Sequence, residues 1–566
     1  MTSTMLISYQ TYFRDLWPIL RDMSTRGIPI DAVKREELRE LIERESLRVD
    51  DEIRKMVPPE VLQRKPKNGY KLPPILSCED CGWKGRTDHL CVFRASSDDA
   101  ELMQVSYTVL AELAGLVQRE VIIEGDQEKC QCRKKSRESC RVCSGTGIVP
   151  AGTVELRWAS PLAFNPNSRP QVIRYIKYLG HPVPKHAKRT DANGDASDTT
   201  EVRELERLFA KTHHPIYPLL IQKRQLTKML GTYVDGYQPH KDGKLHSTYG
   251  YGTATWQLTS KSPNVQNSPA RGKSPFQKSL VEAFNRMMTS SEGCTLVNFD
   301  YKSFHAQTTA CEAGLPDYLR LAKIDLHSFT TCHFIKHPDR HGLLKLPDNE
   351  LKQFFKAQKK DDRIWQNGMT FLDIRNGKAK SCGLAVGFGA RHKKIYQLYK
   401  EDFDSQHEVE VLWNLIVHEL FPGLYKWQES IKEKAAEDKR LVSRFGAIRH
   451  FFDVRHWDRK QQKWAGGEQA EAAIAFLPAS NAFGMIRFGM LEMEKKGLLS
   501  KYRLINSTHD SLKFDCPNEL VQECIQQIVP IAQAPCPMMI YPGVTGPEGL
   551  SVEVESQVGS SNLDLH

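Results

Sequence analysis

The sequence predicts an α+β protein with several domains, and three observations lead to this class. Residues 8–57 and most of 156–250 follow the apolar spacing of helices, and strand-like runs alternate with helices from about residue 240 onward. A segment of distinct composition, residues 60–155, separates the two helical parts. A chain of 566 residues is also too long for a single hydrophobic core.

The amino-terminal part contains two predicted helices. In the first, Trp17, Leu20 and Met23 lie on one face. The second helix is highly charged and begins near Ala32. Its predicted apolar stripe consists of Leu38, Leu41, Ile42 and Leu47. A Pro-Pro pair at 58–59 ends this helix, because proline cannot continue the helical hydrogen-bond pattern.

A later predicted helix, from Tyr217 to Val234, carries three cations. These are Lys223, Arg224 and Lys228. Their side chains can lie along a nucleic-acid backbone, where Lys and Arg neutralise phosphates.

Two apolar, strand-like runs each contain an aspartate at or near their end. The run 296–301 contains Asp300, and the run 502–511 contains Asp510. Two carboxylates that adjacent strand ends deliver into one polar site can hold a pair of Mg²⁺ ions, the arrangement needed for in-line transfer at a phosphate. We therefore expect Asp300 and Asp510 to meet in the folded protein.

Positive charge is concentrated between the two aspartates. The formal net charge of the chain is +10, whereas residues 351–400 alone carry twelve Lys or Arg and only three Asp. Such a segment beside a carboxylate site suits a triphosphate and a nucleic-acid backbone. The pattern therefore predicts a nucleotidyl-transfer site; the alternative is a solvated basic helix face.

The tract from Thr255 to Arg271 is dense in short hydrogen-bonding side chains. Amides and hydroxyls of this kind can contact sugars and the minor-groove acceptors that every base pair presents. The candidate contacts are Gln257, Asn264, Gln266, Asn267 and Arg271. Taken alone, the tract is explained equally well as a polar loop.

The order of these features resembles that of the A-family DNA polymerases, which include bacterial DNA polymerase I and the T7-type phage replicases. Three stretches are similar to the family's three motifs, in order: Asp300-Tyr301 with the later Asp325-Leu-His327-Ser, Lys380 to Gly389, and His509-Asp510-Ser511. The resemblance covers nearly the whole chain outside residues 60–155 and includes the Pro263–Asn267 tract.

The resemblance implies a right-hand polymerase fold, with an antiparallel palm and helical fingers and thumb. The implied boundaries are 1–59 for an N-terminal helical segment, 60–155 for the insert, 156–250 for the thumb, 251–324 for the first part of the palm, 325–400 for the fingers and 401–566 for the second part of the palm. It also implies template-directed addition of dNTPs to the 3′-hydroxyl of a primer.

The resemblance further implies roles for single residues. Asp300 and Asp510, with the backbone carbonyl of Tyr301, would bind two Mg²⁺ ions, and Lys380 would neutralise charge on the triphosphate. The remaining implied nucleotide contacts are His305, Arg375, Lys378, Leu384 and Phe388. His509 would contact the primer-terminal phosphate, and Asn481 replaces a glutamine that is usual in a later helix of the family.

Several positions depart from the family pattern. His305 stands where the family usually has a glutamate that acts as a steric gate against ribose, so the rejection of ribonucleotides stays open. Ser511 replaces a usual glutamate, and His-Asp-Ser also occurs in phage-type RNA polymerases. Arg375 lies one residue out of the usual arginine-to-lysine register, Leu384 replaces an aromatic, and Gln257 replaces an arginine. These departures predict a divergent phage or mobile-element enzyme.

The polymerase-like region begins near residue 8, and no Asp-x-Glu tract fills the role of an exonuclease. We therefore expect no 3′–5′ proofreading in this chain, which a separate exonuclease can supply. No run of about 18 uncharged apolar residues and no secretory signal is present, so we expect a cytoplasmic protein, in the host cytoplasm if it is phage-encoded, with no membrane partner.

Half of the cysteines, seven of fourteen, fall between Cys78 and Cys143. The first group has the spacing of a zinc knuckle and the second that of a zinc ribbon, and soft ligands in closed sets of four are typical of structural Zn²⁺. The groups are Cys78, Cys81, His89 and Cys91, and then Cys130, Cys132, Cys140 and Cys143. Mixed pairing between the groups, and a surface role for His89, are alternatives.

The insert also carries the basic run Arg133–Arg137, which can bind DNA or a partner such as a helicase, primase or processivity factor. A purely stabilising role is equally compatible with the sequence. For the whole chain, the leading expectation is a DNA polymerase acting on primer-template DNA and dNTPs. The alternatives are a phage-type RNA polymerase or primase-like enzyme, and a zinc-dependent DNA-binding protein with an inactive polymerase fold.

Overall fold

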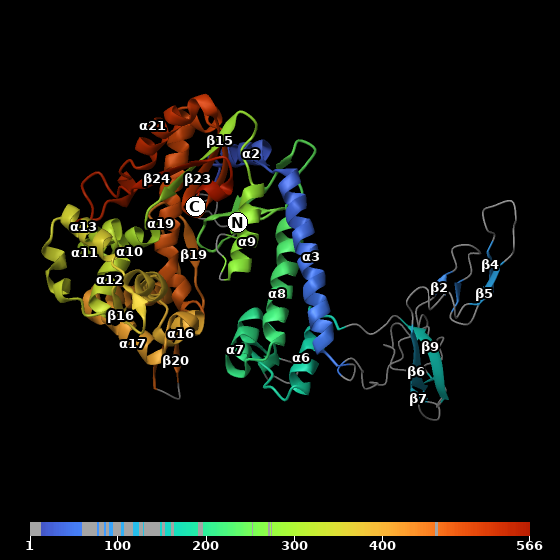
Figure 1. Cartoon of the computed structure of the whole chain (residues 1–566). Helices are drawn as coiled ribbons and strands as arrows, with labels where there is room; N and C mark the ends of the chain where they lie inside the picture. Colours follow the sequence, from blue (N-terminus) through green and yellow to red (C-terminus); the bar gives the residue numbers. More distant parts are fainter. Residues whose placement is uncertain are drawn as a thin grey trace. The chain divides into compact units, whose positions relative to one another are not determined.

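The computed structural model of the chain describes residues 13–58, 61, 164–190, 196–251, 253–269, 272, 274–458 and 462–565, together with short strands between residues 76 and 159. Two compact units contain these residues: unit 1 consists of residues 1–40 and 231–566, and unit 2 of residues 41–230. More of the described residues lie in helices than in strands, and the strands pair antiparallel, so the predicted α+β class is confirmed (Figure 1).

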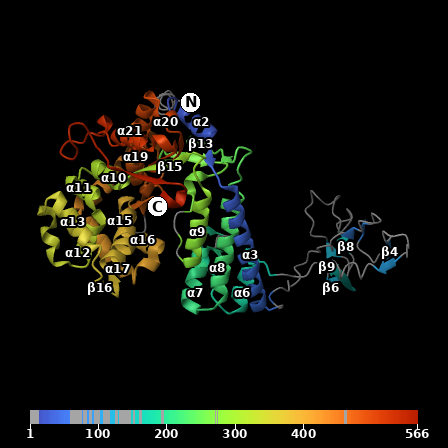
Figure 2. The same ribbon diagram turned by 45° about the horizontal axis from the view of Figure 1, so that its top comes forward.

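Unit 2 is built around helices, as predicted for this part of the chain. They are the portion of α3 (Ala32–Met56) from residue 41 onward, α6 (Arg169–Tyr178), α7 (Val202–Thr212) and α8 (Ile216–Lys228). Figure 2 shows α3 and α8 side by side, and a hydrogen bond of 2.6 Å from Lys223 Nζ to Asp50 joins them. Tyr175 on α6 donates to the main-chain carbonyl of Met56, at 2.9 Å.

The buried stripe of α3 differs in two positions from the stripe that the sequence predicts, and one of them is Leu41, which is only half-buried. Leu38 and Ile42 are buried, whereas Leu47 is 67% exposed. Val49 and Ile53 are fully buried and continue the stripe toward the end of the helix. The spacing from Ile42 to Val49 and Ile53 keeps these residues on one helical face, and Leu47 lies off that face.

The described strands of the insert form antiparallel pairs. β2 (Leu76–Ser77) pairs with β3 (Lys84–Gly85), and β7 (Glu128–Lys129) pairs with β8 (Ile148–Val149). β4 (Leu90–Phe93) pairs with β5 (Met103–Ser106), and β6 (Val117–Ile123) with β9 (Thr153–Ala159). Of the predicted zinc ligands only Cys91 lies in a described element, the backbone of β4; the other seven lie outside the described residues.

The central sheet of unit 1 has four antiparallel strands in the order β22–β23–β15–β24. Their bounds are Leu504–Thr508, Ser511–Pro517, Cys294–Tyr301 and Val554–Gly559. The apolar residues Leu296, Val297 and Phe299 of β15 are almost fully buried. The two strand-like runs that contain Asp300 and Asp510 are therefore strands of one sheet, as predicted.

Helix α19 (Ala470–Lys495) is the central core helix of unit 1. By length and composition it could cross a membrane, the one such helix among the described residues, but 78% of its most apolar window is buried inside the protein. It packs against α10 (Phe304–Ala313), α18 (Pro422–Asp438) and α21 (Val521–Ala532). Its apolar side chains are thus explained by the protein core.

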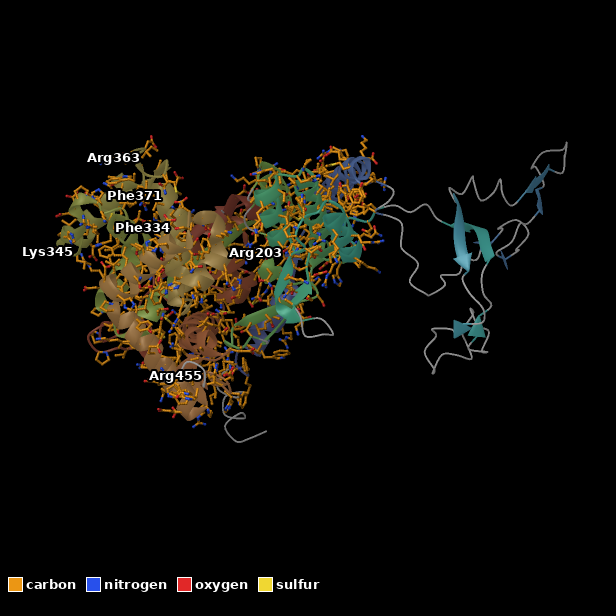
Figure 3. The ribbon with its side chains drawn as sticks, turned by 90° about the horizontal axis from the view of Figure 1, so that it is seen from below. Arg203, Phe334, Lys345, Arg363, Phe371 and Arg455 are labelled. Carbon is orange, nitrogen blue, oxygen red and sulfur yellow. The ribbon has the colours of Figure 1, made fainter. Side chains whose placement is uncertain are left out.

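A second helical region of unit 1 follows α10. Its elements include α12 (Leu326–Phe334), α14 (Phe371–Ile374), the π-helical turn η5 (Arg375–Ala379), α15 (Lys380–Gly387), α16 (His392–Tyr399) and α17 (Gln406–Asn414). Phe371, labelled in Figure 3, is fully buried in this region. Because α15 packs against both α16 and α17, the helical region continues past residue 400.

Candidate functional site

The structure brings Asp300 and Asp510 together at one edge of the central sheet. Asp300 is the penultimate residue of β15 and pairs with Ser511, the first residue of β23. Asp510 lies in the two-residue loop between β22 and β23, where His509 adopts a φ of 47°. The main-chain N–H of Tyr301 donates to the carbonyl of Asp510, at 3.0 Å. The predicted meeting of the two aspartates is therefore present.

Burial and like charges act on the carboxyl group of Asp300. Burial, followed by the negative charges of Asp510 and Glu555, raises the pKa of Asp300 to about 7. Carboxylates that repel one another in a partly buried site fit a hard divalent cation such as Mg²⁺, which takes oxygen ligands and keeps part of its coordination for water and phosphates. Within the described ranges, no group of three or more His, Cys, Asp or Glu side chains is arranged to hold a metal by itself.

His305, at the start of α10, lies beside these carboxylates. Its ring faces that of Phe388 at a centroid distance of 5.9 Å, and its Nε2 lies 3.4 Å from the amide nitrogen of Gln257. Burial lowers the pKa of His305, although the charge of Asp510 raises it and His509 lowers it further. Gln257, His305 and Phe388, which the sequence assigns to one site, are therefore neighbours.

The helix α15 presents its predicted residues on one side. Lys380, Leu384 and Phe388 recur at intervals of four residues, so they share a helical face. Leu384 is 41% exposed, and Lys380 and Phe388 are half-buried. Gly389, at a φ of 81°, ends the helix, because a residue with a side chain rarely adopts this conformation.

The turn before α15 is wider than an α-helical turn. Residues 375–379 are π-helical, and the N–H of Lys380 donates to the carbonyl of Arg375, five residues earlier. Side chains five residues apart therefore lie one above the other here. Arg375 and Lys380 begin successive turns on the same side of the helix.

The guanidinium of Arg375 is bound by Asp325. Its Nη2 donates to Asp325 at 2.8 Å, and its Nε also donates to Ser328 at 3.0 Å. Burial would raise the pKa of Asp325, but the hydrogen bonds and charge of Arg375 lower this pKa to about 2. Lys359 adds a second cation to Asp325, at 3.0 Å.

Lys378 has a different position from the one expected of a phosphate contact. Its side chain is 1% exposed, and its ammonium lies 2.9 Å from Asp404 and 2.5 Å from Glu408. Burial opposes the charge, but these two carboxylates raise the pKa of Lys378 above its usual value. Its charge is thus compensated inside the helical region.

The sequence reasoning assigned no role to His327, which lies against α15. The Nδ1 atom of His327 is buried without a hydrogen-bond partner among the described residues. Burial, followed by the charge of Arg375, lowers its pKa to about 4; Lys380 also lowers this pKa, while Asp325 raises it. A Cβ at Gly383 would lie 3.3 Å from Nδ1, so glycine allows the ring to approach the helix. The sequence signal that could have identified His327 is its position two residues after Asp325, within a stretch that resembles a family motif.

The polar tract is attached to the β22–β23 hairpin. Gln266 donates from its amide to the main-chain carbonyl of Ser507 on β22, at 2.7 Å. The side-chain oxygen of Asn264 accepts from the hydroxyl of Ser260 and caps the 3₁₀ turn η3 (Val265–Asn267). Asn267 is exposed, and Arg271 lies outside the described residues.

Asn481 lies in the core of α19. It is fully buried, its amide donates to Glu312 at 2.7 Å, and its carbonyl oxygen accepts from the main-chain N–H of Arg444 at 3.0 Å. Burial raises the pKa of Glu312, while its hydrogen bonds with Tyr541 and Asn481 lower it. In this structure the side chain of Asn481 therefore connects buried segments of unit 1.

The three cations predicted to follow DNA lie on α8 in unit 2. Lys223 is buried and pairs with Asp50 on α3, and Arg224 donates to the hydroxyl of Thr200 at 2.7 Å. Lys228, one turn later, is exposed. The structure thus separates two cations with internal partners from one on the surface.

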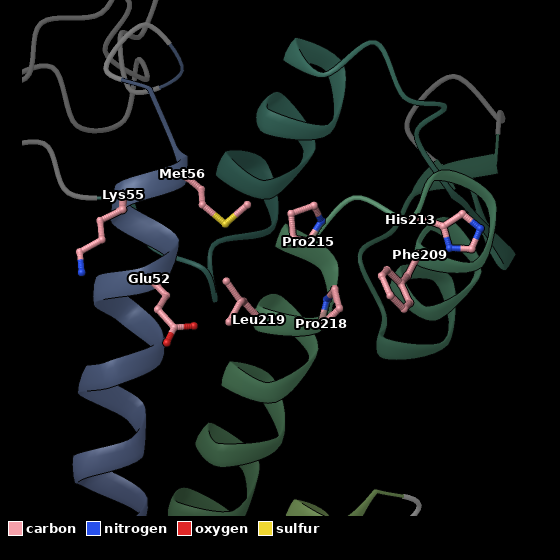
Figure 4. A pocket seen from close by; sticks show the side chains of 8 residues that line it. All are labelled: Glu52, Lys55, Met56, Phe209, His213, Pro215, Pro218 and Leu219. Carbon is pink, nitrogen blue, oxygen red and sulfur yellow. The ribbon is translucent and has the colours of Figure 1, made fainter.

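Unit 2 also contains a pocket of about 660 Å³ between α3, α7 and α8 (Figure 4). Its walls combine apolar side chains with three polar ones. They are Glu52, Lys55, Met56, Phe209, His213, Pro215, Pro218 and Leu219. None of these residues belongs to the predicted site.

Comparisons with known proteins agree with this geometry. Residues 155–341 match the family described as DNA polymerase family A. The chain is 24% identical over 385 residues to the thermostable DNA polymerase I of Thermus aquaticus, covering 65% of this chain and 40% of the relative. Over 135 residues it is 34% identical to DNA polymerase I of Deinococcus radiodurans, covering 23% of this chain and 13% of the relative.

A solved structure shares the fold. This is the POL domain of Pol1 from M. smegmatis in complex with DNA primer-template and dNTP, with a TM-score of 0.52, 20% identity, and coverage of 71% of this chain and 62% of that chain. The likeness confirms the predicted right-hand fold. The match with the Thermus aquaticus relative spans 40% of that protein's length.

Proposed function

We propose, since this chain belongs to DNA polymerase family A, that it extends a primer 3′-hydroxyl with dNTPs under the direction of a DNA template. The observation that carries the proposal is the pairing of β15 with β23, which places Asp300 beside the loop that holds Asp510. Two carboxylates at one sheet edge, next to a basic helical region, are the groups that transfer of a nucleotidyl group requires.

Asp300, Asp510 and the main-chain carbonyl of Tyr301 would hold magnesium at this site. When bound, Mg²⁺ would lower the pKa of the primer hydroxyl and neutralise charge on the phosphates. The side chains themselves position the substrates. Lys380 on α15 binds the triphosphate, and the unpartnered Nδ1 of His327 adds a neutral hydrogen-bonding group on the same side.

Arg375 contributes to the same phosphate-binding face in a fixed orientation. Asp325 and Ser328 hold its guanidinium through Nε and Nη2, and Nη1 is turned toward Asn376 at 2.7 Å. This arrangement supports a guanidinium that is oriented before the substrate arrives, which reduces the reorganisation needed in the transition state. The internal ion pairs of Lys378 support a structural role for that residue instead.

The neighbourhood of His305 is proposed to accept the sugar and base of the incoming nucleotide. His305 lies next to both Phe388 and Gln257, beside the carboxylates. A neutral imidazole can block a 2′-hydroxyl by its bulk or bind it by a hydrogen bond. The second candidate function, RNA synthesis, rests on this residue.

A primer-extension assay with dNTPs or NTPs, on DNA and RNA templates, tests both candidates. We expect extension with dNTPs on DNA, and its loss in Asp300→Ala with duplex binding retained. Unchanged synthesis by Asp300→Ala would refute the site. Extension with NTPs alone would instead favour the RNA polymerase alternative.

The proposal includes synthesis without proofreading by this chain, and a divergent phage or mobile-element source. An end-labelled primer with a 3′ mismatch tests the first of these. We expect the mismatched nucleotide to stay in place when dNTPs are omitted. Its removal by the purified protein would contradict the proposal.

Structural zinc in the insert is also a proposal. The pairing of β2 with β3 and of β7 with β8 supports it. The segment between β2 and β3 contains Cys78 and Cys81, and the segment between β7 and β8 contains the four cysteines of the second group. Thiolates joined at such turns are typical of zinc ribbons and knuckles. Metal analysis of protein purified without chelator should give about two zinc ions per chain, from the two ligand sets. Finding none would remove the proposal.

A further inference from the structure

Two tryptophans stand on the surface of unit 1 as a pair. They belong to a hairpin of β20 (Arg455–Asp458) and β21 (Lys463–Gly466), in which Trp457 lies directly opposite Trp464. Their ring centroids are 5.7 Å apart with an interplanar angle of 77°, and the residues are 45% and 62% exposed. Tryptophan is enriched at binding interfaces, because its indole ring combines a large apolar face with one polar N–H group.

The hairpin is anchored, so the exposed rings have a fixed position. Arg455, labelled in Figure 3, forms ion pairs with Glu429 at 3.2 Å and Glu433 at 2.9 Å, both on α18. At the base of the hairpin, Gln469 accepts hydrogen bonds from the main-chain N–H groups of Phe452 and Asp453. These contacts orient the indoles without covering them.

The sequence of the hairpin is basic as well as aromatic. Residues 455–464 contain four Lys or Arg and one Asp. Because α18 neutralises Arg455, the remaining formal charge of this stretch comes, in the sequence alone, from Arg459, Lys460 and Lys463 against Asp458; Arg459 and Lys460 lie outside the described residues. Aromatic rings next to cations are the combination that binds single-stranded nucleic acid, where bases stack and phosphates meet positive charge.

The hairpin is also continuous with the proposed nucleotide site. Just before it, β19 (Ile448–His450) accepts a hydrogen bond of 2.9 Å at its Ile448 carbonyl from the indole of Trp256, the neighbour of Gln257. Just after it, α19 places Ile474 so close to Gly389 that a Cβ there would lie 2.4 Å away. The segments on either side of the hairpin therefore contact Trp256 and Gly389, the sequence neighbours of Gln257 and Phe388.

From these observations we propose that the β20–β21 hairpin binds the unpaired template strand ahead of the primer terminus, with its bases stacked on Trp457 and Trp464. This inference rests on the proposed function. It adds a second nucleic-acid contact, outside the catalytic site, whose ligand is single-stranded and is bound without regard to sequence.

Template overhang length provides the test. Fluorescence anisotropy measures binding to a primer duplex that carries a 5′ template overhang of either about one or about ten nucleotides. The short overhang is too short to fill the site of a typical single-strand binder, and the long one is sufficient. The native protein should bind the long overhang about tenfold more tightly, as expected when bases stack on aromatic side chains. The double variant Trp457→Ala/Trp464→Ala should lose this preference and bind the short overhang as the native protein does.

Two further variants separate stacking from damage to the fold. Trp17→Ala removes an equally exposed tryptophan (56%) on α2 (Trp17–Arg26) and should keep the preference for the long overhang. Trp457→Phe/Trp464→Phe keeps two aromatic faces and should keep most of it. Thermal unfolding midpoints of all variants should stay close to the native value.

An unchanged overhang preference in the double alanine variant would overturn the inference, and so would the absence of any preference in the native protein. Both outcomes concern binding alone. If the native protein binds with the expected preference but extends no primer, the proposed function fails while the hairpin contact stands. The double alanine variant could also lose binding to another protein and still bind the template overhang as the native protein does. That result would assign the surface to a protein partner and overturn the inference.

Discussion

The main-chain N–H of Tyr301 donates to the carbonyl of Asp510 at 3.0 Å, and this bond joins the end of β15 to the loop between β22 and β23. Tyr301 is itself fixed, because it is almost fully buried and its ring stacks on Phe304 at 4.7 Å. The two aspartates are therefore held by backbone geometry and not only by side-chain rotamers.

The first prediction concerns the two aspartates at the sheet edge. Asp300→Asn and Asp510→Asn should each lower the rate of primer extension by at least about 100-fold, because each removes negative charge that a preorganised site uses in the transition state. Single-turnover extension measures the rate, and binding of the duplex should change little. Glu553→Gln, which alters an exposed carboxylate paired with Lys302, is the matched control and should extend normally.

A second prediction concerns stability and pH in the absence of divalent ions. The folded-state pKa of Asp300 is about 7, above the usual value of 3.8, so the folded protein retains a proton that the unfolded chain has lost between these pH values. This group therefore lowers stability progressively as pH rises from about 4 to about 7. Asp300→Asn should remove this loss and stabilise the chelated protein at pH 8 by about 1–2 kcal/mol, after allowance for solvent screening.

Denaturant unfolding at pH 4 and pH 8, with chelator present, measures this effect. At pH 4 the variant and the native protein should have the same stability. Added Mg²⁺ should stabilise the native protein more than the variant, since the carboxylate is a proposed ligand of the ion. A variant that is less stable than the native protein at pH 8 would contradict the assignment.

A third prediction separates two lysines that are neighbours in sequence. Lys378→Met should lower the free energy of unfolding by about 1–3 kcal/mol, because it leaves Asp404 and Glu408 without their shared cation. Lys380→Met should leave stability nearly unchanged and reduce the extension rate. Thermal unfolding and steady-state kinetics of both variants test this prediction. If both substitutions lower the extension rate equally, the two lysines do not have separate structural and substrate-binding roles.

A fourth prediction concerns His327. Replacing it with alanine should raise the KM for dNTPs about tenfold with a smaller change in kcat, since a substrate hydrogen bond is lost. His333→Ala is a matched control on the same helix, because burial also lowers the pKa of His333 to about 4, while its ring faces His341 at 6.1 Å. An equal rise of KM in both variants would indicate a general disturbance of α12.

The sequence could predict the sheet and its aspartates because local pattern and chemistry agree there. The apolar runs around Asp300 and Asp510 have the length of buried strands, and a carboxylate at the end of such a run has few roles other than a polar site. The shared face of Lys380, Leu384 and Phe388 follows directly from helical periodicity. These features depend on neighbours in sequence, which a single chain displays.

The remaining features depend on partners that are distant in sequence. Lys378 is internal because Asp404 and Glu408 reach it from α17 and the residues just before it, and Asn481 is internal because Glu312 lies on α10. Nothing in the residues around either side chain distinguishes a buried partner from a ligand contact. His327 could not be predicted as a site residue, because its position depends on Gly383, which lies much later in the chain and lets the ring approach α15.

The wide turn at residues 375–379 explains how the chain tolerates an altered spacing. An extra residue inserted in a regular helix rotates the preceding residues by about 100° relative to the succeeding ones, which would turn Arg375 away from the side that holds Lys380. In the π-helical turn the hydrogen bond spans five residues instead of four, so one turn takes up the additional residue. The side chains before and after this turn then keep the same side of the helix. A helix with such a turn can hold one residue more than a regular α-helix and still keep Arg375 and Lys380 on one side.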